Sequence, residues 1–160
     1  MEPTHLTLPI KVLPHAKCLS LPHYQSHGAA GLDLMAAIEP DKPIIILPHH
    51  RCLVPCGIAL AIPFGFEGQV RPRSGLALKF GVTVVNSPGT CDQDYRGEIG
   101  ALLVNLGDQP FTVQRGDRIA QLVIAPVVRA RLDLAIDLDE TDRGANGFGS
   151  TGTSQKESLP

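Results

Sequence analysis

Short aliphatic runs, each closed within a few residues by Gly, Pro, Asp or Asn, follow one another along most of this chain. Such spacing is typical of β-strands joined by turns, and no window sustains the apolar period of a long helix. With 16 Gly, 14 Pro and no Trp, the 160 residues favour many short strands packed through Val, Ile, Leu and Ala. We therefore expect one all-β domain, a sandwich or a barrel.

The expected strands share a β-branched or aliphatic core and a Gly, Pro, Asp or Asn boundary. A single short helix is expected over residues 74–80. The strands are expected over residues 8–13, 32–36, 44–47, 51–54, 58–61, 67–71, 82–85, 99–105, 111–113, 118–127 and 131–134.

The composition changes near the end, where residues 143–152 read Arg-Gly-Ala-Asn-Gly-Phe-Gly-Ser-Thr-Gly. Frequent glycine leaves the backbone too free for a strand or a helix. We predict a β domain over residues 1–142 and a mobile arm over residues 143–160. The arm is either a frayed terminus or a loop that closes over an anion and a flat ring.

Charge and terminal sequence exclude several classes of protein. Lys and Arg number 14 against 16 Asp and Glu, which argues against non-specific binding of nucleic acid. No run of about 20 apolar residues predicts a membrane span. Met1-Glu2-Pro3-Thr4-His5 lacks the basic and apolar parts of a secretory signal, so we predict a cytoplasmic location. The four cysteines are then expected as reduced thiols, and the spacing of Cys52 and Cys56 does not suit zinc.

Arg73-Ser74-Gly75 lies where an expected strand gives way to the expected helix. A hydroxyl and free N–H groups at a helix start, with a guanidinium beside them, suit a phosphate. The alternative is a serine that caps the helix between two solvated arginines.

Residues 86–97 join two expected strands through a long connection that contains Pro88 and Gly89. Its length predicts a wide β-hairpin able to hold a small flat ligand. Asp92 or Asp94 can serve there as a general base, or both carboxylates can cap the N–H groups of a turn.

Asp117 and Arg118 open the most apolar expected strand. Alternation predicts Asp117 and Gln121 on one face and Arg118 on the other. Buried polar groups need partners, so an ion pair between Asp117 and Arg118 is the structural interpretation.

Together these blocks resemble the motifs of the trimeric deoxyuridine triphosphatase (dUTPase) family, in order. The resemblance implies a jelly-roll subunit, a homotrimer whose active sites take motifs from three chains, and an arm that closes over the site. It implies hydrolysis of dUTP to dUMP and pyrophosphate, which lowers dUTP and supplies dUMP for thymidylate synthesis. The matching blocks are Ala30-Gly31-Leu32-Asp33-Leu34, Arg73-Ser74-Gly75-Leu76-Ala77, and residues 86–97, 116–121 and 143–152.

The resemblance also implies roles for individual residues. Asp92 would activate the water that attacks the α-phosphorus, and Tyr95 would pack under the deoxyribose and exclude a 2'-hydroxyl. The groups implied for the triphosphate are Arg73, Ser74, Gly75, Gln121 and, at its γ end, Arg143. The groups implied for the uracil are Asn86, Thr90, Cys91 and Gly100 at its edge, with Phe148 stacked on it and Gly149 and Ser150 as backbone contacts.

Mg²⁺ is the implied cofactor, because the triphosphate charge needs neutralising and Mg²⁺ binds mainly through substrate phosphates. Asp33 is either an outer-shell acceptor that reaches the metal through water or a structural carboxylate. Leu32 and Cys91 depart from the common family pattern, which has Tyr and Ile or Val there. Cys91 raises the hypothesis that thiol oxidants inhibit the site.

Two other functions compete with this interpretation. A dCTP deaminase would share the fold, but that family carries a catalytic Glu in the hairpin block, where this chain has Asp92 with Tyr95. A non-catalytic trimer that binds nucleotides has no need of a general base aligned with a phosphate-binding site.

Overall fold

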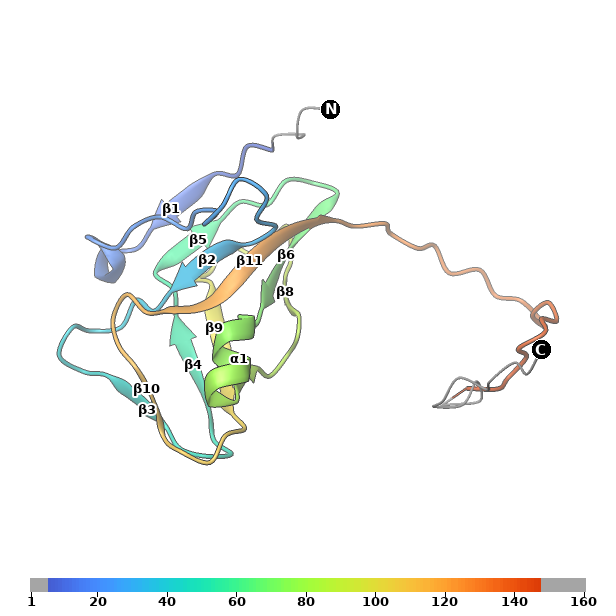
Figure 1. Ribbon diagram of the computed structural model, residues 1–160. Helices are drawn as coiled ribbons and strands as arrows, with labels where there is room; N and C mark the ends of the chain where they lie inside the picture. The colour runs from blue at the N-terminus through green and yellow to red at the C-terminus, as the bar shows by residue number, and fades with distance from the viewer. Residues whose placement is uncertain (1–5, 148–160) are drawn as a thin grey trace. The chain divides into compact units, whose positions relative to one another are not determined.

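The computed structural model describes residues 6–147 (Figure 1). The chain divides into two units, Met1–Val128 and Arg129–Pro160, and every described strand and helix lies in the first. No helix within residues 6–147 is long and apolar enough to cross a membrane.

The first unit is built from short strands with one short α-helix and one 3-10 turn, as expected for an all-β chain. The helix occupies the predicted residues. The elements are β1 (Ile10–Val12), η1 (Pro14–Ala16), β2 (Leu32–Met35), β3 (Ile44–Ile46), β4 (Arg51–Pro55), β5 (Ile58–Leu60), β6 (Phe66–Arg71), α1 (Ser74–Phe80), β7 (Val82–Val84), β8 (Gly89–Cys91), β9 (Gly100–Asn105), β10 (Phe111–Val113) and β11 (Arg118–Pro126).

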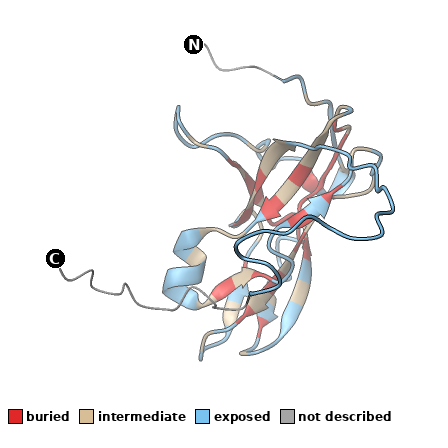
Figure 2. Cartoon of the chain, turned by 90° about the vertical axis from the view of Figure 1, so that its right-hand side faces the viewer, coloured by how far each residue is buried: buried red, intermediate tan, exposed pale blue. Residues whose placement is uncertain are grey.

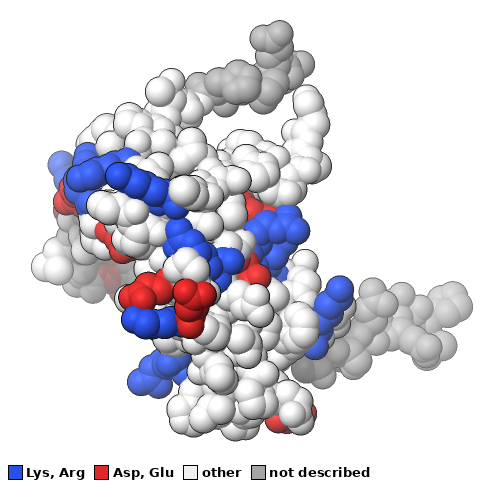
Figure 3. Space-filling view, turned by 90° about the vertical axis from the view of Figure 1, so that its left-hand side faces the viewer, with Lys and Arg blue, Asp and Glu red and all other residues white. Residues whose placement is uncertain are grey.

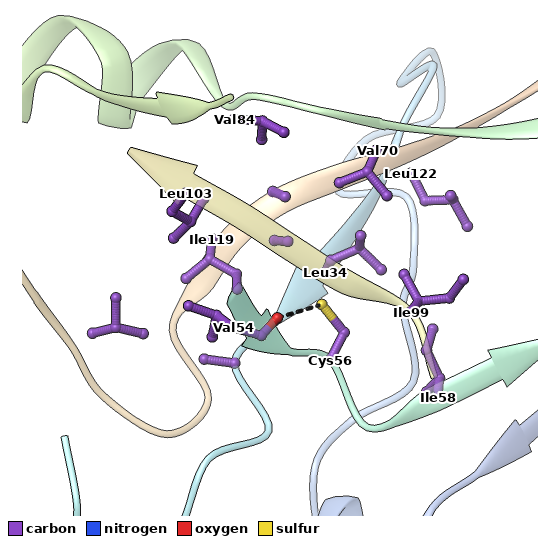
Figure 4. Packing of buried hydrophobic residues seen from close by; sticks show 14 of the residues in the cluster. Leu34, Val54, Cys56, Ile58, Val70, Val84, Ile99, Leu103, Ile119 and Leu122 are labelled. Atoms are coloured by element: carbon purple, nitrogen blue, oxygen red, sulfur yellow. Dashed lines mark hydrogen bonds between the residues drawn. The ribbon is translucent and has the colours of Figure 1, made fainter. Parts of the chain in front are cut away.

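The strands form a four-stranded sheet, β2-β11-β6-β8, a three-stranded sheet, β4-β9-β7, and two strand pairs, β1-β5 and β10-β3. Every pairing is antiparallel. Alternate side chains of the two larger sheets meet in one apolar core, the arrangement of a jelly roll (Figure 4). The core includes Leu34, Val70 and Leu122 from the first sheet and Val54, Val84 and Leu103 from the second.

Burial concentrates on the strands, whereas no residue of α1 is buried (Figure 2). The helix ends at Gly81, whose φ of +68° is the left-handed conformation typical of a helix terminus. On the face shown in Figure 3, Lys and Arg lie among Asp and Glu.

Two strand assignments differ from the prediction. β8 was not expected, because Gly89-Thr90-Cys91 has no aliphatic run, yet it pairs with β6. The strand predicted over residues 131–134 is absent, and residues 127–140 contain no strand. An alternating sequence forms a stable strand only where a partner strand is available, and no strand within residues 6–147 pairs with this segment.

Candidate active site

Three blocks that lie far apart in the sequence meet on the four-stranded sheet. Asp33 on β2 lies opposite Gln121 on β11, and Gln121 lies opposite Arg71 at the end of β6. Arg73 follows β6 directly and occupies the cap position of α1. The register therefore brings the first, second and fourth blocks together, and we call Asp33, Arg73, Arg118 and Gln121 the cradle.

Asp33 is buried and forms ion pairs with two arginines. Its Oδ1 lies 3.3 Å from Nε of Arg73, and its Oδ2 lies 3.2 Å from Nη1 of Arg118. Nη1 of Arg73 also donates to the carbonyl of Arg118 at 2.8 Å. Two guanidinium groups compensate the charge of a carboxylate withdrawn from water. Of the two roles left open for Asp33, this geometry favours the structural carboxylate.

The prediction of an ion pair between Asp117 and Arg118 is wrong. Asp117 is exposed, and its Oδ2 accepts the N–H of Gln114 at 2.7 Å in the preceding turn. The register of β11 on β2 shifts between Arg118 and Ala120, so one step of β2 is matched by two residues of β11. This bulge interrupts the alternation and brings Arg118 to the side that carries Asp33 and Gln121. Arg118 is the cradle residue that sequence alternation placed on the opposite face.

Gln121 holds the connection between β6 and α1. Its Nε2 donates to the carbonyl of Pro72 at 2.9 Å. Gly31 packs against this side chain: a Cβ at residue 31 would lie 3.1 Å from Cβ of Gln121 and closer still to its Oε1. The block around Gly31 thus needs glycine because the backbone passes so close to Gln121.

Ser74 and Gly75 are the first two residues of α1, and both are exposed. The alternative in which Ser74 caps the helix is wrong, because Arg73 occupies the cap position with an extended backbone (φ −98°, ψ 126°). The N–H groups of Leu76 and Ala77 both donate to the carbonyl of Arg73. Ser74 thus lies at the exposed start of the helix, directly after the cap residue Arg73.

The wide hairpin predicted between residues 86 and 97 is confirmed for its two flanking strands, but the connection between them is not a simple loop. β7 and β9 pair as antiparallel neighbours, and the chain between them crosses to the other sheet, where β8 pairs with β6. Thr90 lies opposite Gln69, and Gly100 begins β9. Asn86 is exposed and packs near Gly89, where a Cβ would lie 3.0 Å from its Nδ2.

Asp92 is exposed and comes directly after β8. Its carbonyl accepts the N–H of Tyr95 at 3.1 Å, which closes the turn. Beside it, Cys91 is buried, and burial, followed by the charges of Asp92 and Glu67, raises the pKa of this thiol. The thiolate is the reactive form, so this environment argues against the hypothesis that Cys91 is sensitive to oxidants.

Within one chain, Asp92 lies apart from the cradle. Cys91 pairs with Gly68, so Asp92 follows at the level of Glu67, whereas Arg71 pairs with Gln121 at the other end of β6. A strand rises about 3.3 Å per residue, which separates Asp92 from Arg71 by about 13 Å along the sheet. The expected base and the expected phosphate groups are thus not brought together in a single chain.

The expected arm begins in the second unit. Nε of Arg143 donates to the carbonyl of Asn146 at 2.8 Å, and the N–H of Gly144 donates to Thr141. Phe148, Gly149 and Ser150 lie outside the described residues.

Comparison with known proteins identifies relatives of this chain. The dUTPase family model matches residues 17–152. The deoxyuridine 5'-triphosphate nucleotidohydrolase of Methylocella silvestris is 62% identical over 147 residues, which cover 92% of this chain and 92% of that protein.

Solved structures of phage dUTPases share the fold. A variant dUTPase of Staphylococcus bacteriophage 80alpha with dUpNHpp has a TM-score of 0.78 and 25% identity, covering 92% of this chain and 99% of that one. A variant dUTPase from phage phi11 of S. aureus, described with a structural Mg(II) ion, has a TM-score of 0.72 and 22% identity, covering 82% and 98%. The sequence match over most of its length and the shared jelly-roll fold show that this chain belongs to the dUTPase family.

Proposed function

We propose that this chain is a dUTP diphosphatase, which hydrolyses dUTP to dUMP and pyrophosphate through attack of water on the α-phosphorus. The reaction lowers dUTP and supplies dUMP for thymidylate synthesis. Membership of the dUTPase family supports this function, as does the name of the relative from Methylocella silvestris. The observation that carries it is the cradle, in which residues from three of the family's blocks converge beside the exposed start of α1.

In this proposal Arg73 and Gln121 of the cradle bind the triphosphate, and Asp33 orients Arg73. Asp33 and the carbonyl of Arg118 hold the guanidinium of Arg73 from two sides. A cation fixed before the substrate arrives loses little conformational entropy on binding and stabilises charge that develops on the phosphates. Ser74 and Gly75 add a hydroxyl and backbone N–H groups, and Gln121 maintains the path of the chain between β6 and α1.

The hairpin supplies the base and the nucleoside contacts. Asp92 accepts a proton from the attacking water, a contribution of about 10² to 10⁴ in rate. Tyr95 packs under the deoxyribose, and Asn86, Thr90, Cys91 and Gly100 contact the uracil edge. The residues proposed to cover the bound nucleotide belong to an arm over residues 143–160 and are Arg143, Phe148, Gly149 and Ser150.

We infer that the functional assembly is a homotrimer with shared sites. The separation of Asp92 from the cradle supports this, because a complete site requires the hairpin of another chain. A second observation points the same way: Leu132, Leu134, Ile136 and Leu138 alternate with Asp and Ala, and all four are 81% to 109% exposed. A segment with this alternating pattern and no strand partner within residues 6–147 is suited to pair as a strand with another chain.

Mg²⁺ fits this site through the substrate. Residues 6–147 contain no group of three or more His, Cys, Asp or Glu able to hold a metal ion, and both oxygens of Asp33 are engaged by arginines. Mg²⁺ usually binds through one or two carboxylates and the phosphates, and neutralises charge on them. Asp33 would contact such an ion only through water.

The test is pyrophosphate release with Mg²⁺ from dUTP, dCTP, dTTP and UTP, on the wild type and on Asp92→Asn and Asp94→Asn. We expect release from dUTP alone, a loss of at least about 100-fold in Asp92→Asn, and a much smaller loss in Asp94→Asn. Ammonia from dCTP would instead identify a deaminase. If no nucleotide gave a product, the remaining interpretation would be a non-catalytic trimer that binds nucleotides.

A further inference from the structure

Glu98, at the end of the hairpin, ties together three segments of the chain. Its Oε1 accepts the backbone N–H of Gly57 at 2.7 Å and lies 2.8 Å from Nε2 of His15. An ionised carboxylate only accepts hydrogen bonds, so Nε2 of His15 carries the proton. One oxygen therefore connects η1, the turn between β4 and β5, and the chain that enters β9.

The partners of Glu98 are themselves held in place. Gly57 has a φ of +70°, and a Cβ there would lie 2.7 Å from Cβ of Ala37 and closer to that of Ala16 in η1. The N–H of Leu13 donates to the carbonyl of Gly57 at 2.8 Å. The N–H group that meets Glu98 thus belongs to a backbone that close packing keeps in one position.

The backbone of Glu98 in turn orients Tyr95. Oη of Tyr95 donates to the carbonyl of Glu98 at 3.0 Å. The ring covers Gly97, where a Cβ would lie 2.5 Å from Cζ. Tyr95 is otherwise 47% exposed, so the position of residues 97 and 98 largely decides where its ring lies. The same turn begins at Asp92, whose carbonyl accepts the N–H of Tyr95.

The charge of Glu98 also affects a buried thiol in the core next to these three segments. Burial, followed by the charge of Glu98, raises the pKa of the Cys56 thiol to about 12. The N–H of Cys56 donates to the carbonyl of Ile99, and the N–H of Ile99 donates to that of Ile58. Glu98 is thus a carboxylate fixed at the edge of the core, between the core and the nucleotide hairpin.

We propose that Glu98 is a positioning residue for the dUTPase reaction: its bonds to Gly57 and His15 fix the turn that presents Tyr95 and Asp92, and thereby set the preference for deoxyribose over ribose. This inference rests on the proposed function. Loss of the Glu98 carboxylate frees the turn, so the Tyr95 ring no longer blocks the space of a 2'-hydroxyl. Small displacements of positioning groups can cost about 100-fold in rate.

Kinetics on four variants test the proposal. In Glu98→Ala we expect KM for dUTP to rise about tenfold and the ratio of kcat/KM for dUTP over UTP to fall by a similar factor. Glu98→Gln keeps an oxygen that accepts from Gly57 and His15, so it should remain within about threefold of wild type. His15→Ala removes one of the two bonds at an exposed position and should show a smaller change of the same kind. Glu39→Ala, which removes an exposed carboxylate paired with Lys42, is the matched control.

A measurement without nucleotide separates this proposal from the proposed function. The chain has two tyrosines and no tryptophan, so Tyr95 is the sole strong emitter in a Tyr24→Phe background. We expect acrylamide to quench this emission more strongly after Glu98→Ala and no more strongly after Glu39→Ala. Equal quenching, or an unchanged dUTP to UTP ratio with only a lower unfolding temperature, would overturn the proposal. A wild type inactive on dUTP would refute the proposed function while the quenching result still stood.

Discussion

Asp33 on β2 meets Arg73 beyond the end of β6, with Oδ1 3.3 Å from Nε. The contact joins two sheet neighbours of β11 across that strand, and it orients the guanidinium beside the start of α1. Because Arg118 takes the other oxygen of Asp33, one carboxylate positions two cations. The charge of this carboxylate therefore matters for both stability and substrate binding.

Asp33→Asn should lower the free energy of unfolding by about 1.5 to 3 kcal/mol, the range for hydrogen bonds to a charged group. An amide has one acceptor oxygen and no charge, so one arginine loses its bond to residue 33. KM for dUTP should rise as Arg73 loses its fixed orientation. Urea denaturation measures the stability change. Asp41→Asn, which alters a carboxylate in an exposed turn, is the control. Equal midpoints for the two variants would contradict this role.

Gly31→Ala should disturb the cradle, whereas Gly28→Ala should not. A Cβ at residue 31 forces Gln121 to move and breaks its bond to the carbonyl of Pro72, whereas a Cβ at residue 28 meets nothing within 4 Å. Overpacking of this kind costs about 1 to 3 kcal/mol. We expect kcat/KM for dUTP to fall at least about tenfold in Gly31→Ala alone. Comparable activity in both variants would show that Gln121 adapts without consequence.

Cys56 should make the folded state less stable at high pH. Its pKa rises from 9.0 to about 12 on folding, so between these values the unfolded chain releases a proton that the folded chain keeps. The unfolded state binds fewer protons there, and stability falls as pH rises from about 9, by up to about 1.4 kcal/mol per pH unit for one such group. Urea midpoints measured against pH should decline less steeply in Cys56→Ala than in Cys18→Ala, which alters an exposed thiol. Parallel slopes would mean that the burial of Cys56 does not govern this decline.

Self-association should depend on the apolar side of residues 132–138. Ile136→Asp places a charge among exposed apolar side chains, whereas Ala135→Asp adds the same charge on the side that already carries Asp133 and Asp137. Sedimentation should show dissociation of the trimer at higher protein concentrations in Ile136→Asp than in Ala135→Asp. Identical profiles would remove this segment from the proposed interface.

Deletion of residues 143–160 should leave the β domain folded and turnover severely reduced. All described strands end by Pro126, so the deletion removes none of the sheet pairings described within residues 6–147. Circular dichroism and pyrophosphate release on the truncated chain test this. Turnover equal to that of the full chain would show that the terminus does not act on the nucleotide.

Local sequence determined most of the secondary structure and the family motifs of this protein. The apolar runs and their boundaries predicted most strands, and residues 74–80 form the expected helix. These features depend on contacts between near neighbours, which propensity and turn chemistry describe. The five blocks indicate the family from sequence alone, because each block keeps its residue types and internal spacing in one short stretch.

Only the tertiary structure decided which of these residues meet. The bulge before Ala120 turned Arg118 toward Asp33, and the pairing of β8 with β6 set Asp92 apart from the cradle. The carboxylate of Glu98 contacts His15 and Gly57, which lie in two other segments of the chain. Register and bulges follow from the packing of remote segments rather than from alternation. Residues 131–138 carry a strand pattern but form no strand, because backbone groups of a strand need a partner and no strand within residues 6–147 pairs with them.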